Sequence, residues 1–161
     1  MRRDLQELYQ AVVLDHARSP RNFRRVEDAT CHAHGSNPMC GDEVTVYLAV
    51  GEDGVIDDAG FEAKGCAISL ASGSIMTEVL VGRTPAQAER LFEAFERLCT
   101  GADDGDLAPS NAASALTPDG AAALDRLRVL EGVRSFPVRI RCAILPWQAM
   151  HAALSGRGRT D

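Results

Sequence analysis

Hydrophobic residues recur every three or four positions at the start of the chain, which predicts an amphipathic helix over residues 4–18. Its apolar stripe comprises Leu5, Leu8, Tyr9, Val12 and Val13. The helix should end before Ser19 and Pro20, because proline restricts the residue ahead of it. His16, near that end, is interpreted as a capping or surface residue rather than a ligand. Residues 20–39 are expected to be irregular.

The hydrophobic period changes to two after Glu43, which predicts a half-buried strand. Its apolar positions are Val44, Val46, Leu48 and Val50. A second strand is expected over about residues 55–64, after a hairpin connection at residues 51–54. The two strands form an antiparallel pair, which further strands can extend.

Helical spacing returns in the second half of the chain. One helix should begin near Ile68, and Thr84-Pro85-Ala86-Gln87 has the pattern of a capping box that opens another. A third should restart after residue 117 and run toward Leu130. For the last helix we expect a start within a few residues of Cys142, because Pro146 is harmless only in a first turn. Strands followed by helices predict an α+β fold.

Length and charge narrow the class of protein. The 161 residues predict one domain over residues 1–154, with a disordered tail over 155–161. No apolar run approaches the ~20 residues of a membrane span, and no signal-peptide core follows Met1, so we expect a cytoplasmic protein. A net charge of −6 argues against non-specific binding to nucleic acid.

Cysteine is the most informative residue type in the composition. The chain has five cysteines: Cys31, Cys40, Cys66, Cys99 and Cys142. A reducing compartment disfavours disulfides, so some should be metal ligands, reactive groups or core residues. Cys99 closes an apolar stripe and is interpreted as buried. The run Cys31-His32-Ala33-His34 offers three ligands in four residues, but its loop-like surroundings argue against a permanent metal site.

Four polar residues share one kind of position, at the end of an element. Cys40 and Asp42 precede a strand, Cys66 follows a strand, and Cys142 is placed near the start of a helix. Ends of elements can converge at one rim of a domain, where three thiolates and a carboxylate suffice for a tetrahedral zinc site. The spacing contains no CxxC pair. Unrelated buried thiols with an aspartate in a turn therefore remain an equal alternative on the pattern alone.

Several motifs in one order resemble a known family over nearly the whole chain. They are Leu8-Tyr9-Gln10, Leu14-Asp15-His16, Pro20-Arg21-Asn22, Asn37-Pro38, Cys40-Gly41-Asp42, Phe61, Gly65-Cys66-Ala67-Ile68-Ser69, Ala71-Ser72, Leu130-Glu131-Gly132-Val133, Pro137, Arg139-Ile140-Arg141-Cys142-Ala143 and Trp147. The chain is similar to the SufU branch of the IscU/NifU-type iron–sulfur cluster assembly proteins. Two features favour SufU over IscU: Arg141 stands where IscU has histidine, and a segment is inserted at residues 100–130. Glu43 and Pro146 depart from the usual SufU pattern.

The resemblance implies a SufE/NifU (IscU-like) fold, with a small antiparallel sheet of about three strands packed against helices. It also implies a zinc site of Cys40, Asp42, Cys66 and Cys142, in a sulfurtransferase that accepts persulfide sulfur at Cys40 from a SufS-type cysteine desulfurase. Docking would exchange a zinc ligand for a histidine of the desulfurase. Downstream assembly proteins would be further partners, without nucleic acid or membrane. Arg141 could steady the released thiolate, or could simply be solvated.

Two other functions fit the same residues. The protein could be a scaffold on which a [2Fe–2S] cluster is assembled on Cys40, Cys66 and Cys142, with Asp42 making the cluster labile. It could also be a structural zinc module that only mediates contacts.

Overall fold

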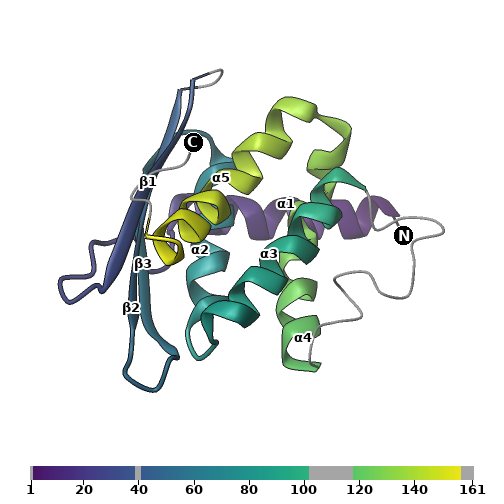
Figure 1. Cartoon of the computed structure of the whole chain (residues 1–161). Helices are drawn as coiled ribbons and strands as arrows, with labels where there is room; N and C mark the ends of the chain where they lie inside the picture. Colours follow the sequence, from purple (N-terminus) through teal and green to yellow (C-terminus); the bar gives the residue numbers. More distant parts are fainter. Residues whose placement is uncertain (1, 39–40, 102–117, 157–161) are drawn as a thin grey trace.

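A computed structural model describes residues 2–38, 41–101 and 118–156 of the chain. Within these ranges the elements run in the order α1 (Arg2–Arg18), β1 (Cys31–Asn37), β2 (Asp42–Val50), β3 (Ile56–Lys64), α2 (Ala67–Leu80), α3 (Pro85–Thr100), α4 (Pro118–Leu127), the 3-10 helix η2 (Arg128–Ser135) and α5 (Pro137–Leu154). One sheet lies beside a group of helices (Figure 1), which confirms the α+β prediction. Cys40, most of the 100–116 segment and residues 157–161 lie outside the described residues.

The sheet has three antiparallel strands in the order β1-β2-β3. Val46 in β2 lies opposite Ala33 of β1 and Phe61 of β3, and all three side chains are fully buried. The strands predicted after residue 43 are therefore confirmed, and so is the count of about three. The prediction that residues 20–39 are irregular is wrong over β1. Glycine, serine and asparagine in that strand have low strand propensity, but pairing with β2 outweighs it.

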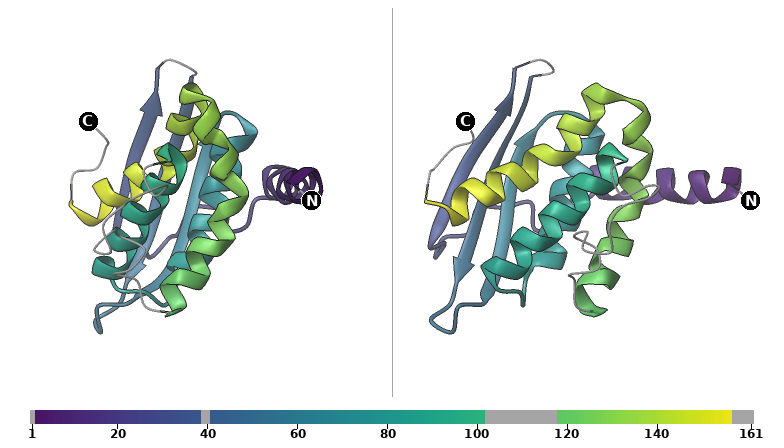
Figure 2. Two further views of the ribbon diagram at one scale, coloured as in Figure 1. Left: turned by 90° about the vertical axis from the view of Figure 1, so that its right-hand side faces the viewer. Right: turned by 45° about the vertical axis from the view of Figure 1, so that its right-hand side comes forward.

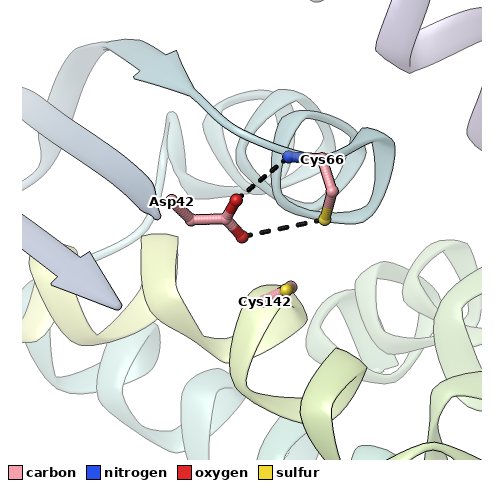
Figure 3. A group of neighbouring side chains, drawn as sticks. All are labelled: Asp42, Cys66 and Cys142. Carbon is pink, nitrogen blue, oxygen red and sulfur yellow. Dashed lines mark hydrogen bonds between the residues drawn. The ribbon is translucent and has the colours of Figure 1, made fainter. Parts of the chain in front are cut away.

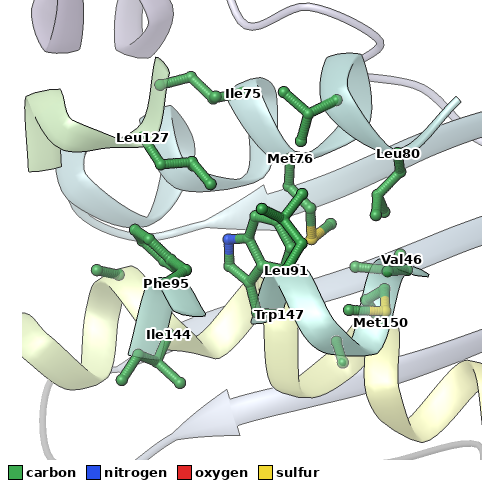
Figure 4. Packing of buried hydrophobic residues seen from close by; sticks show 14 of the residues in the cluster. Val46, Ile75, Met76, Leu80, Leu91, Phe95, Leu127, Ile144, Trp147 and Met150 are labelled. Atoms are coloured by element: carbon green, nitrogen blue, oxygen red, sulfur yellow. The ribbon is translucent and has the colours of Figure 1, made fainter. Parts of the chain in front are cut away.

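Helices cover one face of this sheet: they lie to one side of it in Figure 1 and in front of the strands in the left view of Figure 2. The hydrophobic core lies between the two layers, with Trp147 of α5 among Leu91, Phe95 and Met76 (Figure 4). Helix α1 packs against α2 and η2 rather than on the sheet. None of the helices in the described ranges is long and apolar enough to cross a membrane.

Helix α5 differs from its predicted form. It begins at Pro137, so Pro146 lies in its interior, and Cys142 lies inside the helix rather than near its start. Proline at the first helical position is favourable, because its fixed φ suits the helix and its missing N–H is not needed there. Burial of residues 142–147 in the core supplies the stabilisation that offsets the backbone hydrogen bond lost at Pro146.

Candidate metal centre

Three of the four predicted ligands converge at one end of the sheet. A carboxylate oxygen of Asp42 and the sulfur atoms of Cys66 and Cys142 all lie within 4.8 Å of one another. They come from β2, the residue before α2, and α5 (Figure 3). Asp42 and Cys142 are buried, whereas Cys66 is partly exposed. The fourth predicted ligand, Cys40, lies outside the described residues.

The pairing of β2 with β3 brings Asp42 to Cys66. Glu43 pairs with Lys64 at the end of that ladder, so the next residues outward are Asp42 and Gly65. The Cys66 backbone N–H donates a hydrogen bond to Asp42 Oδ1 at 3.1 Å, and Cys66 Sγ lies 3.7 Å from Asp42 Oδ2. Cys66 is also the N-cap of α2. The carboxylate is therefore fixed beside the thiol by backbone geometry.

Gly65 makes this close approach possible. A Cβ atom at residue 65 would lie 2.3 Å from Asp42 Oδ1 and 2.9 Å from Ser69 Oγ. No heavy-atom contact of that length is tolerated, so any side chain there would push the carboxylate away from Cys66. The glycine that precedes Cys66 is thus a structural requirement of the site.

An arginine that sequence analysis did not single out lies beside the two sulfur atoms. The negative charge of Cys66, together with hydrogen bonds to Cys142 and Cys66, raises the pKa of the Arg139 guanidinium. The available signal was spacing, because Arg139 lies three residues before Cys142 and helical residues three apart share a face. Arg141 is exposed on the same helix. The role predicted for Arg141, stabilising a released thiolate, remains untested by the structure.

The run Cys31-His32-Ala33-His34 is divided between the two faces of the sheet. Cys31 packs against the core, as does Ala33, whereas His32 and His34 are exposed. His34 is paired with Glu43 and Thr45, and His32 stacks on Tyr47. Alternation in β1 therefore separates the thiol from both imidazoles. In the described part of the chain, the Asp42 group is the sole cluster of three such ligands.

The donor set suits a borderline-soft divalent metal. Two thiols and one carboxylate supply three of the four ligands of a tetrahedral zinc site, at a separation that one ion can bridge. Carboxylate is a harder ligand than thiolate, so its bond to such an ion is the more easily exchanged. Cys40, two residues before Asp42, is the candidate for the fourth position.

Fold and site together define a small α+β protein in which two cysteines and an aspartate, a set that could hold a metal ion, meet at one end of the sheet. Residues 8–118 match the model of the NifU-like N-terminal domain. The chain belongs to this family. This confirms the resemblance that the motifs indicated.

Relatives with two different names match nearly the whole chain. An iron–sulfur cluster assembly scaffold protein IscU of Thermotoga maritima is 34% identical over 149 residues, which cover 91% of this chain and 92% of the relative. A zinc-dependent sulfurtransferase SufU of Bacillus subtilis is 31% identical over 152 residues, or 94% and 92% of the two chains. The crystal structure of a protein described as an iron–sulfur cluster assembly scaffold for the SUF system, from Fervidobacterium islandicum, superposes with a TM-score of 0.73 at 28% identity, covering 89% of this chain and 93% of that one.

Proposed function

We propose that this protein is a zinc-dependent sulfur acceptor in iron–sulfur cluster assembly, with Cys40, Asp42, Cys66 and Cys142 as zinc ligands. It takes persulfide sulfur from a SufS-type cysteine desulfurase and passes it to downstream assembly proteins. The observation that carries the proposal is the convergence of Asp42, Cys66 and Cys142 on one point. The name of the Bacillus subtilis relative supports zinc and sulfur transfer. We also propose a cytoplasmic location, since thiol chemistry of this kind requires a reducing compartment.

The transfer step that we propose is a thiol–persulfide exchange. The Cys40 thiolate attacks the outer sulfur of the desulfurase persulfide, and a new sulfur–sulfur bond forms as the old one breaks. The donor cysteine leaves as a thiolate with the bonding electron pair, so the exchange needs no external oxidant or reductant. Bound zinc would keep the thiols of its ligands deprotonated before transfer.

The surrounding residues have distinct parts in this scheme. Asp42 would supply the oxygen ligand, whose bond to a borderline-soft metal is more readily exchanged than a thiolate bond, and this would help to release Cys40. Arg139 places a positive charge beside Cys66 and Cys142, where it would attract the negative charge that these residues carry as metal ligands. Arg141 remains a second candidate for stabilising the released thiolate or persulfide.

A second function uses the same residues differently. The Thermotoga maritima relative is named as a scaffold, and a group of thiols with one carboxylate can also hold iron in a [2Fe–2S] cluster. We rank it second, because arginine rather than histidine stands at residue 141.

Three measurements separate these functions. We expect about one zinc and no iron per purified chain by elemental analysis, as four protein ligands saturate one tetrahedral ion. Desulfurase turnover should rise when wild-type protein is added and should not rise with Cys40→Ala. Undiminished stimulation by Cys40→Ala excludes the acceptor role. A stable cluster formed on anaerobic reconstitution, and then transferred to an acceptor protein, favours the scaffold.

A further inference from the structure

A buried hydrogen bond connects helices α2 and α5, which position Cys66 and Cys142. The hydroxyl of Ser72 in α2 donates to the carbonyl oxygen of Ala143 in α5. Both residues are fully buried. Ala143 follows Cys142 directly, and Ser72 lies six residues after Cys66, so this bond fixes α5 against α2 close behind the metal centre.

The hydrogen bond lies in the part of α5 whose backbone lacks one helical hydrogen bond. Pro146 has no N–H, so it cannot make the helical hydrogen bond that residue 146 would otherwise donate to the carbonyl of Cys142. An interior proline also allows a helix to bend at that point. The first half of α5, which carries Cys142, therefore relies more on contacts with the neighbouring elements β1, β2 and α2 for its position.

We propose that Ser72 is a positioning residue for the metal centre. Its hydroxyl sets the separation of the Cys66 and Cys142 sulfur atoms by tying Ala143 to α2. This inference rests on the proposed function in that the two thiols are taken to share one zinc ion. It assigns to Ser72 a part in holding them at the spacing which that ion needs.

A matched pair of variants on the same helix tests the proposal. Ser72→Ala removes the bond to Ala143. Ser74→Ala removes an equally buried hydroxyl, which contacts His16 and the Arg21 backbone N–H instead. Zinc affinity is measured by competition with a chromophoric chelator. We expect about ten-fold weaker binding for Ser72→Ala, as for loss of groups that orient metal ligands, and a change below about two-fold for Ser74→Ala. The cobalt–thiolate absorption of the Co²⁺-loaded protein should change only in Ser72→Ala.

Equal zinc affinity of Ser72→Ala and wild type would overturn the proposal, as would equal losses in both variants. If Ser72→Ala does not fold, the Ser72→Thr and Ser72→Val pair gives the same comparison. These side chains have the same shape, so only the hydroxyl differs between them. We expect Thr to bind zinc more tightly than Val by about ten-fold, and equal affinities would again overturn the proposal.

A metal-independent measurement separates failure of this inference from failure of the proposed function. In a metal-free Cys40→Ser background, oxidised glutathione converts the Cys66 and Cys142 thiols to a disulfide by exchange and is itself reduced to two thiols. The equilibrium reports how closely the two sulfur atoms are held together. Ser72→Ala should lower the equilibrium constant, and Ser74→Ala should not. This comparison stands even if the wild-type protein binds no zinc, whereas unchanged disulfide formation in Ser72→Ala contradicts the inference directly.

Discussion

The carboxylate of Asp42 is held against the backbone of Cys66, with Oδ1 accepting the Cys66 N–H at 3.1 Å. This contact joins the start of β2 to the start of α2, so one aspartate links the sheet and the helix that carry the candidate ligands. It requires a residue without a side chain at position 65, where a Cβ atom would lie 2.3 Å from the same oxygen. The geometry of the candidate metal centre therefore depends on Gly65 as well as on the candidate ligands.

Gly65→Ala should displace the Asp42 carboxylate and weaken the site. We expect the free energy of unfolding of the metal-free protein to fall by about 1–3 kcal/mol, from the buried hydrogen bond lost or strained at Asp42. Zinc affinity should fall by about ten-fold or more, as when groups that orient metal ligands are lost. Urea unfolding and chelator competition measure the two effects.

Gly132→Ala is the control for this prediction. A Cβ atom at residue 132 has no heavy atom within 4 Å. The control should therefore leave zinc affinity unchanged. Wild-type zinc affinity in Gly65→Ala would show that zinc binding does not require the Asp42 carboxylate to be held against Cys66.

Gly73 and Phe61 form a second close contact, between α2 and β3. A Cβ atom on Gly73 would lie 2.7 Å from Cε2 of the Phe61 ring. Alanine is favoured over glycine in a helix by about 1 kcal/mol, but inserting a methyl group into a packed core costs about 1–3 kcal/mol. We expect Gly73→Ala to be destabilising by about 1 kcal/mol net in urea unfolding.

A double-mutant cycle isolates this contact. Phe61→Leu creates a cavity on its own, but it also makes room for the new methyl group. The loss in Gly73→Ala/Phe61→Leu should therefore be smaller than the sum of the single losses by about 0.5–3 kcal/mol. Additive losses would show that the ring moves aside without strain.

The parts of the fold that sequence analysis predicted correctly are those fixed by local chemistry. The Thr84 side chain accepts from the Gln87 N–H, and the Gln87 side chain accepts from the Thr84 N–H, as the capping box requires. Strand β2 was evident because its alternation matches a sheet with one face on the core. Its hydrogen bonds then fix the register that brings Asp42 to Cys66.

The predictions that are wrong concern residues whose structure is decided by contacts between different elements. Strand β1 has weak propensity and exists because β2 offers a partner. The prediction that Pro146 lies in a first turn is wrong, because burial of its helix offsets the hydrogen bond that the proline cannot make. The prediction of a capping or surface role for His16 is wrong, since the side chain is only 6% exposed because α1 packs on α2. No pattern within a single element contains the contacts that decide these cases.

The buried environment of His16 predicts a dependence of stability on pH. Its Nδ1 lies 2.7 Å from Ser74 Oγ, which also accepts the Arg21 backbone N–H. Burial lowers the pKa of His16, as do the charges of Arg21 and Arg126, while Glu78 and Asp15 raise it. The unfolded chain therefore binds a proton at higher pH than the folded protein does.

This difference in proton uptake determines whether the free energy of unfolding rises or falls with pH. Above the ordinary histidine pKa of about 6.5, His16 is neutral in both states and has no effect on the pH dependence. Below about pH 6.5, His16 takes up a proton more readily in the unfolded chain than in the folded protein. The free energy of unfolding therefore decreases as the pH is lowered, by up to about 1.4 kcal/mol per pH unit. Urea unfolding of metal-free wild type and His16→Gln between pH 7.5 and 5 should show a smaller decrease in the variant. Parallel curves would show that His16 does not titrate differently on folding.

The position of Arg139 beside Cys66 and Cys142 yields a prediction that separates it from Arg141. Both arginines are exposed, so Arg139→Gln and Arg141→Gln should change the free energy of unfolding by less than about 0.5 kcal/mol. Removing the charge beside the thiols should lower the rate of persulfide transfer from the desulfurase by about ten-fold in Arg139→Gln, which corresponds to the loss of one charge-assisted hydrogen bond. The transfer rate is measured by single-turnover trapping of labelled persulfide, with zinc content determined in parallel. Slow persulfide transfer in Arg141→Gln together with wild-type transfer in Arg139→Gln would instead assign the charge-stabilising role to Arg141, which is one of the two interpretations that its position in the sequence allows.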